Sequence, residues 1–273
     1  MNPYLELLRP YNGVLAIFGV IIGAIVGAPL LLSVSILIAI IVAFLINGAG
    51  NTINDYFDYE IDKINRPKRP IPSGRIKRSM VLNYFILLII VSLIFSYFVS
   101  VHFFYLAIIN SIVSFVYSWK LKGTPLIGNI AVSWLAASTF LAGALIASDF
   151  YSLNMSVIIL ASLAFLATLS REIFKDVEDV KGDKTAGIKT LPLVMGEPKS
   201  SIFASIILII GILSLLLPVY YNLFSIFYYI GMVPAVLICL AALRYMKNAH
   251  KAQKMIKIAM YFVFLGFILG TLL

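Results

Sequence analysis

Two aspartate motifs with one common spacing carry most of the chemistry that this sequence could perform. Their members are Asp55, Asp58 and Asp62 in the first motif and Asp176, Asp179 and Asp183 in the second. Both read D-x-x-D-x-x-x-D, and residues at i, i+3 and i+7 share one face of a helix. Each motif therefore predicts a stripe of carboxylates. Carboxylate oxygens bind Mg²⁺, which commonly bridges to substrate phosphates, so two facing stripes predict a site for a diphosphate.

A charged helix end that is simply solvated is the alternative interpretation of each motif. Three aspartates on one face repel each other, however, and aspartate is a poor helix former. Solvation does not require this arrangement twice with the same spacing. Each stripe also continues backward along its helix, through Asn51 and Asn47 in the first motif and through Glu172 and Thr168 in the second. The pattern therefore favours two helices that emerge at one surface and hold metal ions between them.

Basic residues around the two motifs are candidates for contacts with phosphate. They are Lys63, Arg66, Lys68, Arg69 and Arg75 after the first motif and Lys175 and Lys184 around the second. Arginine is suited to bidentate contacts with phosphate, although each cation could instead be ordinary positive charge at a membrane edge. Residues 66–75 contain three prolines, which exclude a continuous helix, so an ordered cap over the site is expected there. A third candidate, Tyr117 with Lys122, could alone be an interfacial anchor.

The composition places the elements that must position these residues in a membrane. Hydrophobic residues make up 62% of the 273-residue chain and charged residues 12%, against about 45–50% and about 25% in ordinary soluble proteins. One soluble core could not bury this much apolar surface, so the surrounding solvent is expected to be lipid. The predicted class is all-α, a polytopic membrane protein. Its single domain, residues 1–273, is expected to surround a central cavity beneath a cytoplasmic cap that carries both motifs.

Six stretches without Lys, Arg, Asp or Glu predict nine transmembrane helices. They are residues 10–54, 79–119, 123–148, 150–170, 200–243 and 258–273. A spanning helix needs about 20 apolar residues, so the three long stretches are expected to be hairpins of two spans and the others single spans. The hairpins should bend at Pro29, at residues 100–102 and at residues 218–222. The last span is short, and Lys257 could lengthen it by reaching toward the surface.

The distribution of basic residues predicts how these spans are oriented. All 21 Lys and Arg residues precede the first span or lie in the connections after every second span, and the opposite face carries one acid, Asp149. Because positive charge stays cytoplasmic, the N-terminus is expected inside and the C-terminus outside a cell membrane. The net charge of +9 then needs no nucleic acid to explain it. The cations of residues 244–257 could bind anionic lipid headgroups.

Cysteine and histidine are too few for other kinds of metal centre. Cys239 is the sole cysteine, so no intrachain disulfide can form, and His102 and His250 are the only histidines. A zinc or haem site would lack ligands, so any metal is expected to be a hard ion bound by oxygen. The first ten residues contain Glu6 and Arg9 and do not follow the pattern of a cleaved signal peptide.

Together these features resemble the UbiA superfamily of intramembrane prenyltransferases. Asn54, the first aspartate motif and the Arg66-Pro and Arg69-Pro pairs are similar to the first signature of the superfamily, and the second motif is similar to its second signature. Tyr117 and Lys122 match its tyrosine–lysine stretch after the fourth span. Within the superfamily, four segments look most like the archaeal digeranylgeranylglyceryl phosphate synthases. They are residues 8–12, 49–58, 66–75 and 175–192.

The resemblance implies Mg²⁺-dependent transfer of a geranylgeranyl group from geranylgeranyl diphosphate to the hydroxyl of geranylgeranylglyceryl phosphate. This reaction forms the second ether bond of archaeal membrane lipids. All six aspartates would be catalytic and would hold Mg²⁺. The substrate-binding residues would be Asn12, Asn51, Asn54, Arg66, Arg69, Tyr117, Lys122, Arg171, Lys175 and Lys184. The partners would be the prenyl diphosphate, the lipid-phosphate acceptor and membrane lipids, and neither nucleic acid nor an obligate protein partner is implied.

Three other functions compete with this one. An aromatic acceptor, as in quinone or haem biosynthesis, would use the same metal chemistry. A transporter would place ionisable groups near the middle of the membrane on broken helices, whereas the spans expected here are uncharged. A CDP-alcohol phosphotransferase also uses aspartates and Mg²⁺, but the sequence lacks the Asp-Gly-x-x-Ala-Arg pattern expected of that class.

Overall fold

The computed structural model is helical throughout the part of the chain that it describes, residues 2–27, 33–185 and 187–273. Its long helices are α2 (Pro10–Gly27), α3 (Val34–Phe57), α5 (Arg78–Tyr97), α6 (Val101–Trp119), α7 (Ile127–Ala144), α8 (Met155–Thr185), α10 (Glu197–Ser214), α12 (Tyr228–Arg244) and α13 (Ala249–Leu272). The short ones are α1 (Pro3–Leu8), α4 (Tyr59–Asn65), the 3₁₀ helix η1 (Leu121–Gly123), α9 (Leu191–Met195) and α11 (Leu217–Tyr220). The predicted all-α class is confirmed. Pro29 and the side chain of Asn12 lie outside the described part.

Seven helical segments of the described residues are long and apolar enough to cross a membrane. They contain α3, α5, α6, α7, α8, α10 and α13. Two further apolar helices, Gly13–Gly27 within α2 and Tyr228–Arg244, are shorter. Many of their large apolar side chains face outward, Leu37 and Leu237 among them, as expected where the surrounding solvent is lipid.

Polar side chains cap the N-termini of several of these helices where the chain bends between one helix and the next. The hydroxyl of Ser100 accepts a hydrogen bond from the backbone N–H of Phe103 and donates one to the carbonyl of Leu145. Asn248 caps α13 by accepting from the backbone N–H of Lys251. Such caps satisfy backbone donors that the first helical turn leaves without partners. The predicted bend at residues 100–102 is therefore confirmed at the start of α6, and the one at residues 218–222 contains the short helix α11.

Two helices are longer than the uncharged stretches that predicted them. α8 starts at Met155 and continues to Thr185, well beyond residue 170, so it carries the whole second aspartate motif. α13 starts at Ala249 rather than near residue 258, and Lys251, Lys254 and Lys257 lie in its first three turns. Absence of charge marks the apolar part of a helix, whereas the helix itself continues into water wherever its backbone is not interrupted.

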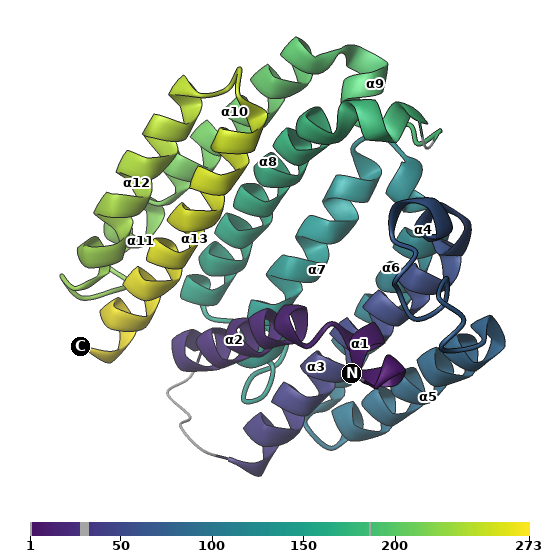
Figure 1. The fold of residues 1–273 in the computed structure, drawn as a ribbon. Coiled ribbons are helices and arrows are strands. Elements are labelled where there is room, and N and C mark those ends of the chain that lie inside the picture. The colour runs from purple at the N-terminus through teal and green to yellow at the C-terminus, as the bar shows by residue number, and fades with distance from the viewer. Residues whose placement is uncertain (1, 28–32, 186) are drawn as a thin grey trace.

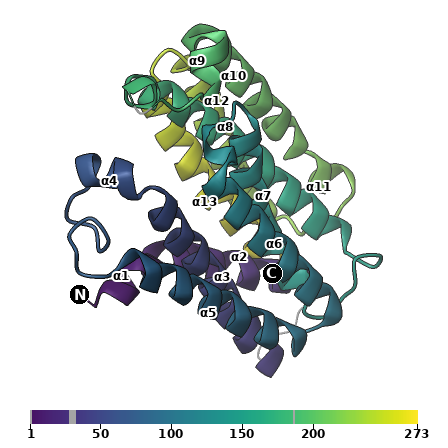
Figure 2. The same cartoon turned by 90° about the vertical axis from the view of Figure 1, so that its right-hand side faces the viewer.

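The helices α2, α3, α6 and α7 form a ring in which each contacts the next. α5 packs on the outside of α3 and α6, while α8 packs against α7 and joins the ring to α10 and α13 (Figure 1). Helices α4 and α9 lie toward one end of the molecule in both views, together with the turn that precedes α13 (Figures 1 and 2). The C-terminus lies away from that end (Figure 1). The ring thus encloses a space whose one end is bordered by both aspartate motifs.

Glycines allow α2 and α7 to cross at close range on one side of the ring. A Cβ atom on Gly143 would lie 2.1 Å from the carbonyl oxygen of Val20, and one on Gly23 would lie 2.0 Å from that of Phe140. A side chain at either position would therefore force the helices apart. This crossing fixes the distance between two walls of the enclosed space.

Candidate active site

A cavity of about 1050 Å³ lies inside the ring and is polar at one end and apolar at the other. Its polar lining comprises Arg9, Asn47, Asn51, Asn54, Asp58, Asp62, Arg66, Arg69, Tyr117, Lys122, Lys175, Asp179 and Asp183, among others. Its apolar lining includes Val20, Val42, Phe103, Leu106 and Ala142. The two motifs, more than 100 residues apart in sequence, therefore border one cavity, as their common spacing predicts.

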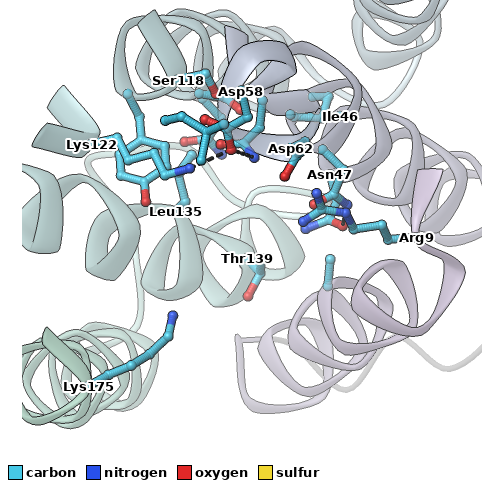
Figure 3. Close-up of a pocket in the computed structure, with 18 of the residues that line it drawn as sticks. Arg9, Ile46, Asn47, Asp58, Asp62, Ser118, Lys122, Leu135, Thr139 and Lys175 are labelled. Atoms are coloured by element: carbon cyan, nitrogen blue, oxygen red, sulfur yellow. Dashed lines mark hydrogen bonds and ion pairs between the residues drawn. The ribbon is translucent and has the colours of Figure 1, made fainter. Parts of the chain in front are cut away.

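The first motif is not one continuous helix, so that part of the prediction is wrong. α3 ends at Phe57, and Asp58 adopts φ −77° and ψ 3° before α4 begins at Tyr59. The amide of Asn54 donates to the carboxylate of Asp58 at 2.9 Å, and the ammonium of Lys122 contacts the same oxygen. These contacts hold Asp58 at the break, where it faces the cavity (Figure 3).

The other two aspartates of the first motif are buried and neutralised by arginines from different segments. Asp55 and Asp62 are each 4% exposed. Arg69 donates to Asp55 at 3.0 Å and also contacts Asp62, while Arg9 contacts Asp55 from the start of α2. Buried carboxylates require such partners, because removing an ion from water costs several kcal/mol. The arginines therefore tie the start of α2 and the loop after α4 to the end of α3.

The second motif lies on one helix, as predicted, and faces the first across the cavity. Asp179 and Asp183 line the cavity, and Lys175 points into it from α8, on the side opposite Asp58 (Figure 3). Asp176 instead borders an adjoining polar pocket of about 140 Å³. There its carboxylate accepts a 2.8 Å hydrogen bond from the amide of Asn129 on α7.

Residues 66–77 form the predicted non-helical cap beside this site. Ile71 and Ile76 are buried against Leu7 of α1, which anchors the loop through apolar contact. Arg75 donates two hydrogen bonds to Glu6 at 2.7 and 3.0 Å, and these lower the pKa of that carboxyl from its ordinary value. The loop is therefore fastened to α1 while it presents Arg66 and Arg69 to the cavity.

Some predicted residues lie apart from the cavity, and some functional candidates were missed. Arg171 contacts Glu172, and neither it nor Lys184 is among the described residues that line the cavity. In the sequence, Arg9 contributes to the predicted orientation of the spans. A lone cation at the start of a span is also a usable signal for a residue that pairs with a buried acid. Asn129 could have been noticed as an amide in an otherwise apolar span. The positions of these residues in the sequence do not reveal that Arg9 pairs with Asp55 or that Asn129 bonds to Asp176.

The donor set suits a hard metal ion that also binds a phosphorylated ligand. Within the described ranges, no three carboxylate, histidine or cysteine side chains converge closely enough to hold an ion by themselves. Mg²⁺ is usually bound through one or two carboxylates and completes its shell with water and substrate phosphates. Asp58, between α3 and α4, and Asp179, on α8, both line the cavity and offer carboxylate oxygens of this kind. The residues therefore fit Mg²⁺ that arrives together with a diphosphate.

Comparison with known proteins decides the family. Residues 16–268 match the UbiA prenyltransferase family, and the digeranylgeranylglyceryl phosphate synthase of Methanosphaera stadtmanae is 41% identical over 278 aligned residues that cover 100% of both chains. The chain belongs to the UbiA prenyltransferase family. The predicted family and the predicted enzyme class, a prenyltransferase, are thereby confirmed. Its apolar helices make this UbiA protein a multi-pass membrane protein.

Solved structures of UbiA proteins share its fold. One, described as digeranylgeranylglyceryl phosphate synthase, has 34% identity and a TM-score of 0.88, and the match covers 98% of this chain and 97% of the other. A UbiA homologue from Archaeoglobus fulgidus bound to GPP and Mg²⁺ has 19% identity and a TM-score of 0.75, with 98% and 99% of the two chains covered. The second likeness shows the fold alone.

Proposed function

We propose that this UbiA protein transfers a geranylgeranyl group from geranylgeranyl diphosphate to the free hydroxyl of geranylgeranylglyceryl phosphate. The single observation that carries the proposal is the 41% identity, over the full length of both chains, to a digeranylgeranylglyceryl phosphate synthase. A cavity with carboxylates at one end and apolar walls at the other also suits a substrate that joins a diphosphate to a hydrocarbon chain. One domain, residues 1–273, performs the whole reaction.

Five of the six aspartates of the two motifs, all except Asp55, line the cavity or the adjoining polar pocket and would hold Mg²⁺ together with the diphosphate. Asp55, which is paired with Arg9 and Arg69, would position them. Bound Mg²⁺ neutralises the negative charge that develops on the departing diphosphate. Arg66 and Lys175, which both line the cavity, contact phosphate oxygens directly. Asn51 is held by hydrogen bonds from its amide to the carbonyl of Leu8 and to Asn47, so it has a fixed orientation at the membrane side of the site.

Tyr117 and Lys122 lie where the allylic carbon would leave the diphosphate. Both line the main cavity and the smaller pocket that contains Asp176. The bond between the allylic carbon and the diphosphate oxygen breaks, and its electron pair leaves with the diphosphate. The hydroxyl oxygen of the acceptor then bonds to that carbon, and its proton passes to the departing diphosphate. The apolar walls exclude water, which would otherwise compete with the acceptor hydroxyl.

The orientation in the membrane follows from the same charges. We assign nine spans to the helices α2, α3, α5, α6, α7, α8, α10, α12 and α13, with the N-terminus cytoplasmic and the C-terminus outside. This assignment is supported by the position of α4, α9 and the turn before α13 toward one end (Figures 1 and 2). The basic segments 63–78, 171–199 and 244–257 overlap those elements. The reaction would then take place at the cytoplasmic surface, where soluble diphosphate can leave.

A product assay tests this function against its nearest alternative. The purified protein is incubated with labelled geranylgeranyl diphosphate and Mg²⁺, and either geranylgeranylglyceryl phosphate or an aromatic quinone precursor is added. The proposal predicts a labelled diether with the first acceptor that EDTA abolishes. Prenylation of the aromatic ring alone would overturn the acceptor assignment and leave the metal chemistry standing.

A further inference from the structure

Helix α6 provides one continuous wall along the full depth of the cavity. Its lining residues are Phe103, Leu106, Ala107, Asn110, Ser114, Tyr117 and Ser118. They recur every three or four positions, so they form one stripe along the helix. The stripe is polar near Tyr117 and apolar beyond Asn110. At about 1.5 Å per residue, its span from Phe103 to Ser118 is about 22 Å.

A buried hydrophobic cluster lies at the apolar end of the cavity. Five buried members of this cluster, Val20, Val42, Phe103, Leu106 and Ala142, line the cavity, and they come from the four helices of the ring. Behind them, Ala39 and Leu145 are fully buried. The cavity therefore ends on packed side chains at this depth, and we call Val20, Val42, Phe103 and Ala142 the floor.

The floor is held by a rigid backbone on two sides. The close crossing of α2 and α7 at Gly143 places Val20 and Ala142 on helices that cannot separate without losing contact. The hydroxyl of Ser100 joins the start of α6 to the carbonyl of Leu145 at 2.7 Å. Phe103, whose amide bonds to Ser100, is therefore fixed relative to α7. A floor of this kind does not recede easily when a longer ligand enters.

We propose that Phe103 and Ala142 set the maximum length of the prenyl chain that this enzyme accepts. This inference rests on the proposed function, because it requires the diphosphate to bind at the aspartate end. A geranylgeranyl main chain of about 16 carbons spans roughly 19 Å when it is extended at about 1.2 Å per bond. The depth along α6 matches that length. One further isoprene unit would meet the ring of Phe103.

The test changes the floor in both directions and measures which donor is preferred. The variant Phe103→Ala removes the ring from the floor, and Ala142→Leu adds a branched side chain to it. The matched control is Phe104→Ala, because Phe104 is the adjacent residue on α6, is only half-buried, and is not among the described residues that line the cavity. Farnesyl, geranylgeranyl and farnesylgeranyl diphosphates are offered in competition. Both kcat/KM for transfer and Kd for each diphosphate are measured.

The expected result is a shift of length preference in opposite directions. Phe103→Ala raises the preference for farnesylgeranyl over geranylgeranyl diphosphate by about tenfold or more, and Ala142→Leu raises the preference for farnesyl diphosphate similarly, since a pocket distinguishes one methylene by about tenfold or more. Phe104→Ala behaves like the wild type.

An unchanged length profile in both floor variants would overturn the inference and would indicate that the chain leaves between helices into lipid. If no donor were transferred by the wild type, the proposed function would fail instead, and Kd for the three diphosphates would still decide the floor. The milder variant Phe103→Leu replaces Phe103→Ala if the latter does not fold.

Discussion

Arg69 binds the carboxylate of Asp55 across a separation of 14 residues, with Nη1 of the arginine 3.0 Å from Oδ1 of the aspartate. The same guanidinium also contacts Asp62. One side chain from the cap loop therefore bridges the first and last aspartates of the motif. The helix that carries the motif is interrupted between these two aspartates. This bridge keeps the motif together despite the break at Asp58.

Replacing Arg69 with alanine should damage both the fold around the motif and substrate binding. Asp55 and Asp62 would lose a partner while they stay buried, and breaking such a pair costs about 3–5 kcal/mol. Arg9 still contacts Asp55, so we expect the lower end of that range. The check is the apparent thermal midpoint in detergent together with KM for the diphosphate. The control is Lys68→Ala, an exposed cation in the same loop; an equal effect of both variants would contradict a specific role for Arg69.

Asp58→Asn and Asp179→Asn should each lower kcat by about 10²–10³ with little loss of stability. These magnitudes are typical when one group that stabilises developing charge is removed. The two residues line the same cavity, so comparable losses are expected from both motifs. Steady-state rates at saturating Mg²⁺ provide the measurement. Glu60→Gln is the control because Glu60 lies in α4 but is exposed and pairs with Lys63. Wild-type rates in either aspartate variant would exclude that residue from the metal site.

Asn129→Ala should weaken the second motif through Asp176. The amide of Asn129 donates to that carboxylate at 2.8 Å, and residues that orient a ligand for a metal typically change metal affinity by about 10–100-fold when they are lost. The concentration of Mg²⁺ that gives half-maximal activity should rise accordingly. Ser133, one turn further along α7, donates to the carbonyl of Asn129. Ser133→Ala should leave the Mg²⁺ requirement unchanged, and an unchanged requirement in Asn129→Ala would refute this positioning role.

The proposed orientation can be tested by labelling single cysteines. Cys239 is the sole cysteine and is buried, so Cys239→Ser provides a background without thiols. On it, Tyr151→Cys should react with a membrane-impermeant maleimide from outside intact cells, because Tyr151 is 96% exposed in the connection between α7 and α8. Lys247→Cys, between α12 and α13, should react only after permeabilisation. The reverse labelling pattern would show that the protein has the opposite orientation in the membrane.

The sequence predicts the helices well because one property, the length of each uncharged stretch, decides where they form. A stretch without charge that is long enough to span lipid must satisfy its backbone internally, and a helix does so. The ends of α8 and α13 were predicted less well, since a helix that leaves the membrane no longer needs apolar residues. The break at Asp58 depends on contacts with Asn54 and Lys122, and no local pattern reports them.

The site was predicted in its chemistry rather than in its pairings. The shared spacing of the aspartates indicated carboxylates on facing helices, and both motifs do border one cavity. The partners of the buried carboxylates come from distant segments, such as Arg9 for Asp55 and Asn129 for Asp176. Which cation reaches which carboxylate is decided by the packing of the ring. A single sequence does not contain that information in readable form.

In the proposed reaction, both aspartate motifs bind one prenyl diphosphate through Mg²⁺. The most direct test is calorimetric binding of geranylgeranyl diphosphate to the wild type, Asp58→Asn and Asp179→Asn, each with Mg²⁺ and with EDTA. We predict that Mg²⁺ tightens binding to the wild type by at least about tenfold, or about 1.4 kcal/mol, and that either variant loses most of this gain. Equal affinity with Mg²⁺ and with EDTA, or loss of the gain in only one motif's variant, would contradict the account.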